Sequence, residues 1–352
     1  MSAGTVLITG LNGFVAPHIA FTFLSSGWNV RGTVRSSSKR DKVLALPLLK
    51  KGADEGRLTV VIVPDFLESD WTEALEGVTA VVLAASPFDM TLPTYEKFAY
   101  PAIQGTTRSL KAAAKVASIQ AVAYVSSTVS IVDYFQPMSS HKSKVYSEKD
   151  WVPWTEEDAK KEGFIAPHWY SISKKYGELA ARDIREKTGA SWPLSTYCPP
   201  GIYGPPQHIN SEEELAGTPG TDLSTAQLYA FLCSGQDADL PAEYNAQYVD
   251  VRDLAAAIYA GITQQSNGRY ITAGDQVTSQ KIANTARRVR PDLSRFIVKG
   301  DPKSSEALPE GAYSLDTSTS KTELGVKYHT LEETIRDTIA RFEELGAYKK
   351  GN

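Results

Sequence analysis

A tyrosine and a lysine four residues apart, Tyr170 and Lys174, form the clearest candidate pair for acid–base chemistry. They open a stretch with helical spacing, Tyr170–Thr188, and residues i and i+4 share one helical face, so phenol and ammonium are neighbours. A phenol with a pKa of about 10 is a poor catalyst at neutral pH, and a nearby ammonium lowers that pKa. Tyr170 is therefore a candidate proton donor to a carbonyl oxygen, or acceptor from an alcohol. The pattern alone also fits an ordinary surface pair.

A serine at the end of a predicted strand adds a third candidate. The apolar run Ala121–Ser127 predicts a buried strand that ends at Ser127. A ligand of a parallel sheet lies at the carboxyl ends of its strands. The Ser127 hydroxyl is thus placed to hydrogen-bond and orient the oxygen that Tyr170 protonates.

A glycine turn near the start of the chain predicts a nucleotide site. The apolar strand Thr5–Thr9 is followed by Gly10, Gly13 and Ala16, an amphipathic helix, and a second strand, Asn29–Val34. Gly10 permits a tight turn, Gly13 lets the backbone approach phosphates, and Ala16 keeps helix and strand close. The free N–H groups of the helix N-terminus then attract the anion. An ordinary strand–helix turn is the alternative.

The residue after the second strand bears on cofactor choice. An NAD site usually has an acid there that binds the ribose 2′-OH, whereas this chain has Arg35, followed by Lys39. An arginine fork can grip a phosphate with two hydrogen bonds. We therefore expect NADP(H), with its 2′-phosphate, rather than NAD. A solvated surface pair is the alternative.

Strands alternating with helices predict an α/β fold: a Rossmann-type, doubly wound parallel sheet with a smaller, partly interleaved C-terminal substrate lobe. We expect residues 1–205 to form the NADP-binding domain, with returning segments near 247–275, and residues 206–246 and 276–352 to form the substrate lobe. Further predicted strands and helices are Leu58–Pro64, Trp71–Glu76, Ala80–Ala85, Tyr95–Ala117, Pro193–Tyr197, Ala226–Cys233, 247–262, 269–273, Ser279–Val289 and Leu331–Leu345. Residues 39–57 suggest one solvated helix and a loop, and 147–163 a surface excursion.

Composition excludes several classes. The 352 residues are 42% hydrophobic and 22% charged, with a net charge of −4, which argues against a broad nucleic-acid surface. Two cysteines and five histidines show no disulfide framework and no metal-ligand spacing, so we expect no metal. No apolar run approaches the roughly 20 residues of a membrane span, and no signal peptide is evident. We therefore expect no membrane partner and a cytoplasmic location.

Together these motifs resemble the extended short-chain dehydrogenase/reductases. The resemblance also rests on Asp65, on the Pro-x-x-x-Tyr-Gly-Pro run at 199–205, and on 248–255 (YVDVRDLA). The segments 10–16 (GLNGFVA), 35–39 (RSSSK), 85–88 (ASPF) and 126–130 (SSTVS) are similar to yeast and fungal NADPH-dependent aldehyde, methylglyoxal and ketone reductases and their plant relatives, the dihydroflavonol and cinnamoyl-CoA reductases. Similarity is weakest in 131–168 and 206–245.

The resemblance implies roles for further residues. It places the cofactor phosphates on the turn and the adenine beside Asp65 and Phe66. It places the nicotinamide ribose against Lys174 and the segment 84–86. Cofactor-binding residues on this basis are Gly10, Asn12, Gly13, Phe14, Val15, Arg35, Lys39, Asp65, Phe66, Ala84, Ala85, Ser86, Tyr170, Lys174, Pro199, Gly201 and Ile202. Substrate-facing residues are Phe88, Thr128, Trp169 and Tyr203, although core packing explains each aromatic equally well. Departures from the usual pattern are Ala16, Gln104 and Cys198.

The leading hypothesis is an NADPH-dependent reductase that turns an aldehyde or ketone into an alcohol, acting as a monomer or homodimer on a small-molecule carbonyl substrate. Alternatives are an NAD-dependent nucleotide-sugar epimerase or dehydratase, disfavoured by Arg35, and a non-catalytic NADP(H)-sensing regulator, disfavoured by the presence of Tyr170 and Lys174. A secondary-metabolite carbonyl is compatible with this hypothesis, although no residue selects it. A bulky or aromatic carbonyl is suggested by aromatic residues that could form one roomy pocket or lid: Trp151, Trp154, Phe164, Trp169, Tyr229, Phe231 and Tyr244.

Overall fold

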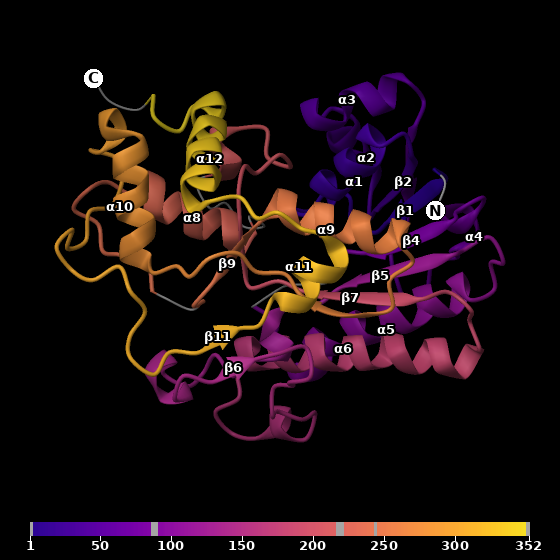
Figure 1. The fold of residues 1–352 in the computed structure, drawn as a ribbon. Coiled ribbons are helices and arrows are strands. Elements are labelled where there is room, and N and C mark those ends of the chain that lie inside the picture. The colour runs from indigo at the N-terminus through magenta and orange to yellow at the C-terminus, as the bar shows by residue number, and fades with distance from the viewer. Residues whose placement is uncertain (1–2, 86–90, 216–221, 243–244, 350–352) are drawn as a thin grey trace.

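The computed structural model describes residues 3–85, 91–215, 222–242 and 245–349. Its centre is a parallel seven-stranded sheet in the order β10-β7-β5-β4-β1-β2-β3, which confirms the predicted fold class (Figure 1). The strands are β1 (Thr5–Ile8), β2 (Asn29–Val34), β3 (Leu58–Ile62), β4 (Ala80–Leu83), β5 (Ala121–Val125), β7 (Leu194–Cys198) and β10 (Gly268–Ile271).

The inner strands β1, β4, β5 and β7 are buried on both faces, which explains their continuous apolar runs. Successive side chains point to opposite sides: Val6 and Ile8 lie in one core cluster, and Leu7 lies in another. β1 pairs with β2 on one side and with β4 on the other. The strand order therefore reverses at β1, and ligands of such sheets bind beyond the carboxyl ends of the strands at that reversal.

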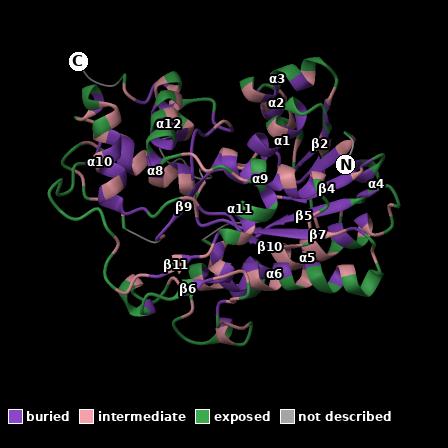
Figure 2. Cartoon of the chain, viewed as in Figure 1, coloured by how far each residue is buried: buried purple, intermediate pink, exposed green. Residues whose placement is uncertain are grey.

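Helices cover both faces of the sheet, and Figure 2 shows the strands as largely buried between them. On one face, α1 packs against α9 and α3. On the other, α5 packs along α6 (Figure 1). The helices on the two faces are α1 (Ala16–Ser25), α2 (Ser37–Leu44), α3 (Pro47–Asp54), α4 (Thr72–Leu75), α5 (Tyr95–Ala113), α6 (Ala166–Thr188) and α9 (Val251–Thr263).

Two expectations about helices need correction. α6 begins at Ala166, four residues before the predicted start, because Pro167 occupies its first turn, where a missing N–H costs nothing. Tyr170 therefore lies in the second turn. Residues 39–57 contain two helices rather than one, because Leu46 and Pro47 end α2 and start α3, and Leu49 is buried against the core.

α8, α10 and α12 build a second core around Phe231, Ile335 and Phe342, each fully buried. It lies beside the sheet, at the left of Figure 1. Its elements and the connecting pieces are β6 (Val145–Tyr146), β8 (Gly201–Tyr203), α7 (Glu212–Leu215), α8 (Leu223–Cys233), β9 (Tyr248–Asp250), α10 (Ser279–Val289), β11 (Ser314–Leu315), α11 (Ser318–Leu324) and α12 (Leu331–Leu345), with 3-10 turns η1 (Thr128–Ser130), η2 (Met138–His141), η3 (Asp158–Lys160) and η4 (Pro291–Leu293). The predicted domain limits stay a prediction.

Two features are absent from the described residues. No helix among them is long and apolar enough to cross a membrane. No group of three or more histidine, cysteine, aspartate or glutamate side chains among them is arranged to hold a metal ion.

Candidate active site

The fold brings Ser127, Tyr170 and Lys174 together at the carboxyl edge of the sheet. Ser127 lies two residues beyond β5 and caps η1, while Tyr170 and Lys174 lie on successive turns of α6. Tyr170 and Ser127 are hydrogen-bonded through their side chains. The Lys174 Nζ lies 5.7 Å from the centre of the Tyr170 ring and donates a hydrogen bond of 3.3 Å to the carbonyl oxygen of Val125. Serine, phenol and ammonium thus form one contiguous group.

Burial dominates the electrostatics of this group. It raises the pKa of Tyr170 to about 12, against a smaller lowering by the Ser127 hydrogen bond. It lowers the pKa of Lys174 to about 8. The expectation of a lowered tyrosine pKa is therefore wrong for this structure, because loss of solvent around the phenolate outweighs any help from the ammonium.

The Ser127 hydroxyl is oriented by the segment that follows β7. Its Oγ donates to the carbonyl oxygen of Pro199 at 3.4 Å and accepts from the backbone N–H of Val129 at 3.3 Å. The same Pro199 oxygen accepts the backbone N–H of Thr128 at 2.9 Å. Pro199, predicted to bind the cofactor, is thus beside the candidate catalytic residue Ser127.

The turn after β1 leaves its backbone open to a ligand. Gly10 has φ of +68°, and a Cβ there would lie 2.9 Å from the Cβ of Ala85. A Cβ on Gly13 would meet only the Gly10 oxygen, at 3.4 Å. The turn therefore requires glycine at the first position and leaves space at the second. α1 follows with no acidic residue in its first turn, which suits an anion.

A threonine that sequence reasoning missed joins the ends of two strands. The Thr9 Oγ1 accepts the backbone N–H groups of Ala84 at 3.1 Å and Ala85 at 3.0 Å. It fixes Ala84 and Ala85, two of the residues predicted to contact the ribose, beside the glycine turn. The sequence signal that could have indicated this role is the polar residue at the end of the run 5–9, where a strand meets the glycine turn.

Arg35 and Lys39 lie close enough for the charge of Arg35 to add to the burial that lowers the pKa of Lys39. Arg35 directly follows β2 and is exposed, and the Ser36 side chain caps α2 by accepting the Lys39 N–H. Within the described ranges, no carboxylate forms a salt bridge with either cation. Two adjacent, unneutralised cations at this point suit an anionic group such as a phosphate.

These features fit a phosphorylated dinucleotide. The glycine turn and the start of α1 would hold the pyrophosphate, and Arg35 with Lys39 would hold a ribose phosphate. Asn12 and Gly13 are partly exposed at the turn, while Phe14 and Val15 pack inward; Phe14 is 6% exposed and lies against the rings of His18 and His208.

Comparison with known proteins agrees with this arrangement. Residues 6–274 match the NAD dependent epimerase/dehydratase family. The chain belongs to this family. It is 36% identical to an uncharacterized oxidoreductase of Schizosaccharomyces pombe, over 98% of each chain. It is 29% identical to a ketoreductase of Aspergillus niger, over 96% of this chain and 97% of the other. The crystal structure of yeast methylglyoxal/isovaleraldehyde reductase complexed with NADPH superposes with a TM-score of 0.83 at 25% identity, covering 96% and 98% of the two chains.

The other cofactor residues predicted for this epimerase/dehydratase family member are scattered around the same edge. Asp65 is exposed beyond β3, and its Oδ1 accepts the N–H of Leu67 at 2.6 Å. Phe66 is partly buried against Trp71. Gly201 and Ile202 lie in β8, which pairs with β9. Ser86 and Phe88 lie outside the described residues.

Two predicted substrate contacts are enclosed by protein. Thr128 is 1% exposed, and its hydroxyl bonds to Tyr134 at 2.6 Å and to the Pro199 oxygen at 3.3 Å. Tyr203 is 2% exposed and stacks on Tyr248. Both side chains make their contacts within the protein. Thr128 and Tyr203 therefore support the site from behind and do not face a ligand.

The aromatic residues expected to form one lid divide into separate clusters. Trp154 and Phe164 pack together with Trp169 of the first turn of α6, and the Trp169 Nε1 donates to the Ala159 oxygen at 3.1 Å. Phe231 is fully buried in the second core, and Tyr229 packs against that core. Trp151 stacks on Arg269, and Tyr244 lies outside the described residues. The expectation of a single lid is therefore wrong. The spacing of residues along the chain does not show which distant segments meet in the folded protein.

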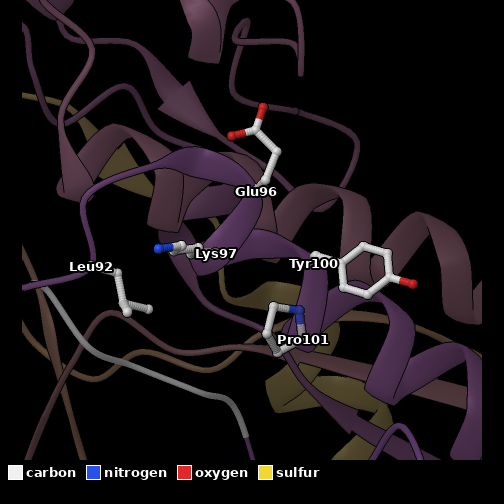
Figure 3. A pocket seen from close by; sticks show the side chains of 5 residues that line it. All are labelled: Leu92, Glu96, Lys97, Tyr100 and Pro101. Carbon is white, nitrogen blue, oxygen red and sulfur yellow. The ribbon is translucent and has the colours of Figure 1, made fainter.

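Phe98 is a site neighbour that sequence reasoning missed. It is 1% exposed on α5, and its ring meets that of Tyr170 edge to face with centroids 6.4 Å apart. On the exposed side of the same helix, a surface hollow is lined by residues of the first turns of α5 and the segment before them (Figure 3): Leu92, Glu96, Lys97, Tyr100 and Pro101. No catalytic candidate lines that hollow.

Proposed function

We propose that this epimerase/dehydratase family member is an NADPH-dependent carbonyl reductase that converts an aldehyde or ketone to an alcohol. The observation that carries the proposal is the contact between Ser127 and Tyr170, with Lys174 one turn away, at the sheet edge that also holds the glycine turn. That arrangement can orient a carbonyl oxygen and protonate it.

Arg35 and Lys39 support NADPH as the cofactor. Both lie after β2, where a 2′-phosphate distinguishes NADP from NAD. The yeast reductase that superposes on this chain was crystallised with NADPH. Lys174, with Ala84 and Ala85 behind the turn, would face the nicotinamide ribose.

Tyr170 then acts as the general acid. Bound NADPH would supply the hydride that adds to the carbonyl carbon. As the C=O π bond breaks, the phenol O–H donates its proton to the oxygen, and the Ser127 hydroxyl holds that oxygen in place. With a pKa of about 12, Tyr170 keeps its proton at neutral pH and is still a stronger acid than the alcohol formed. The Lys174 ammonium stabilises the phenolate until water returns the proton.

The test is oxidation of NADPH, and separately of NADH, by a panel of small dicarbonyls, aliphatic aldehydes and aryl ketones. We expect turnover with NADPH and a loss of at least about 100-fold in Tyr170→Phe, which removes the proton donor. Tyr100→Phe is the control, because Tyr100 is 55% exposed on α5 and outside the site. Its rate should equal that of the wild type.

Other outcomes decide between the alternatives. Binding of NADPH without reduction of any carbonyl favours an NADP(H)-sensing regulator. Activity restricted to NADH would contradict the role given to Arg35 and favour a nucleotide-sugar epimerase or dehydratase. The panel also tests the expectation of a bulky substrate, which far faster turnover of small dicarbonyls than of aryl ketones would contradict. A cytoplasmic location and a monomer or homodimer stay predictions.

A further inference from the structure

A buried ion pair lies behind the catalytic group and has no part in the mechanism above. The Arg269 Nε is 3.0 Å from the Glu178 Oε1, and the two side chains are 5% and 0% exposed. Arg269 comes from β10 and Glu178 from α6. Removing two charges from water is costly, so a buried pair is weak support for stability as such. We therefore expect the role of this ion pair to lie in the segments that its two side chains position.

The other Arg269 nitrogens bind two further segments. Nη1 donates to the carbonyl oxygens of Glu148 at 3.0 Å and Asp150 at 2.5 Å. Nη2 donates to the Oγ of Ser130 at 3.0 Å. The guanidinium carbon lies 3.7 Å from the centre of the Trp151 ring. All three guanidinium nitrogens of Arg269 are therefore bound, and Trp151 covers one face of the guanidinium plane.

One of these contacts leads directly to the catalytic serine. The Ser130 Oγ that accepts from Arg269 donates in turn to the backbone oxygen of Ser127 at 2.8 Å. Ser130 is fully buried at the end of η1, which Ser127 caps. Arg269 therefore holds the turn that presents the Ser127 hydroxyl.

The other contact leads to the catalytic helix. Tyr170, Lys174 and Glu178 are spaced at i, i+4 and i+8, so they lie along one face of α6. Anchoring Glu178 fixes the rotation of that face toward β5 and β7. The same guanidinium thus joins the element carrying Tyr170 to the turn carrying Ser127.

We propose that Arg269 is a positioning residue of the proposed carbonyl reductase, setting the distance between Ser127 and Tyr170 by binding Glu178 and Ser130 at the same time. The inference rests on the proposed function. Misplacing reacting groups by about 1 Å can cost roughly 100-fold in rate. A lysine keeps the charge but has one nitrogen, which cannot bind Glu178, Ser130 and the carbonyl oxygens of 148 and 150 together.

The experiment measures kcat and KM for Arg269→Lys, Ser130→Ala and the double variant. We expect kcat to fall roughly 10- to 100-fold in Arg269→Lys while KM for NADPH changes little, because the glycine turn is not touched. If the two residues act through one chain of contacts, the double variant loses no more than the larger single loss. Losses that multiply would overturn the inference, as would an unchanged kcat in Arg269→Lys.

Arg182→Gln is the matched control. Arg182 binds the same Glu178 carboxylate at 2.9 Å, from the solvent side and with 43% of its side chain exposed. It has no contact with Ser130 in the described structure. Its kcat should match the wild type, so a loss equal to that of Arg269→Lys would reduce the role of Arg269 to charge balance.

Hydrogen–deuterium exchange separates failure of this inference from failure of the proposed function. If wild-type protein reduces no carbonyl, the proposed function fails. The rate of exchange in residues 126–130 and 147–151 then replaces kcat as the test of the positioning role of Arg269. Faster exchange confined to those segments in Arg269→Lys supports the positioning role, and unchanged exchange overturns it. If Arg269→Lys does not fold, Ser130→Ala is the test variant, because it leaves the ion pair between Arg269 and Glu178 intact. An unchanged kcat in Ser130→Ala then overturns the inference. If the wild type is inactive, unchanged hydrogen–deuterium exchange in Ser130→Ala overturns it.

Discussion

At the scale of single residues, burial sets the protonation of the two groups that do the proposed chemistry. It raises the pKa of Tyr170 to about 12 and lowers that of Lys174 to about 8. Both shifts disfavour the charged form, as loss of solvent does. Near neutral pH, Tyr170 is a phenol that can donate a proton, and Lys174 is still mostly an ammonium.

A pH profile tests the role of Lys174. Its ammonium is present below its pKa of about 8 and is lost as the pH rises through that value. Because the charge stabilises the phenolate that forms on Tyr170, we expect kcat for carbonyl reduction to be level near neutral pH and to decline above about pH 8. The measurement is kcat at saturating NADPH between about pH 6 and about pH 10.

Lys174→Arg is the control for that profile. A guanidinium stays charged over the whole range, so any remaining activity of this variant should show no decline near pH 8. A wild-type profile that is level up to about pH 10 would contradict the assignment of the transition to Lys174.

At the scale of elements, the turn between β1 and α1 is the most constrained part of the site. Gly10 has a positive φ and also approaches Ala85, whereas Gly27, just beyond α1, has φ of +83° with nothing within 4 Å of a built Cβ. Both positions have a left-handed backbone that would strain an alanine, and only Gly10 has the close approach. They therefore form a matched pair.

We expect Gly10→Ala to destabilise the protein more than Gly27→Ala. Left-handed backbone costs an alanine roughly 1–2 kcal/mol at either position. At Gly10, the approach to Ala85 adds about 1–3 kcal/mol of overpacking and shifts the turn that would hold the pyrophosphate. Chemical denaturation and NADPH titration check this; equal losses of stability with unchanged NADPH affinity in both variants would contradict it.

At the scale of the whole molecule, one arginine joins the sheet side to the second core. Arg252, at the start of α9, binds Asp250 through Nε at 2.9 Å and Nη2 at 2.8 Å, and binds Asp337 of α12 through Nη1 at 2.5 Å. The Asp250 side chain is fully buried. Arg252 also holds the pKa of Asp250 below its usual value, against the effect of burial.

We expect Arg252→Leu to lower the free energy of unfolding by about 3 kcal/mol, because it leaves Asp250 with a buried and unpaired charge. Arg288→Gln is the control: its pair with Glu332 joins side chains that are 54% and 49% exposed, so its loss should stay under about 1 kcal/mol. Urea unfolding measures both. Equal effects would show that Arg252 acts as an ordinary surface charge.

The same ion pair has a pH signature. Because the folded pKa of Asp250 is lowered, its contribution is present above the ordinary aspartate pKa of about 3.9 and is lost as the pH falls through the folded value. Wild-type protein should therefore lose more stability on acidification than Arg252→Leu.

The sequence by itself determined the parts that depend on local spacing. The apolar runs at 5–9 and 121–127 predicted two buried strands, since parallel strands are covered on both faces. Because strand ends and helix faces follow from spacing, the chain order also placed Gly10, Ser127 and Tyr170 at one edge of the sheet. The family followed from the same motifs.

Only the tertiary structure decided what depends on contacts between distant segments. The pKa of Tyr170 rises because residues far along the chain exclude water from it, which no spacing reveals. Thr128 and Tyr203 were expected to face substrate but are enclosed by protein. The contact of Arg269 with both Glu178 and Ser130 joins β10, α6 and η1. Local pattern limits which residues can share a face, and packing alone decides which faces meet.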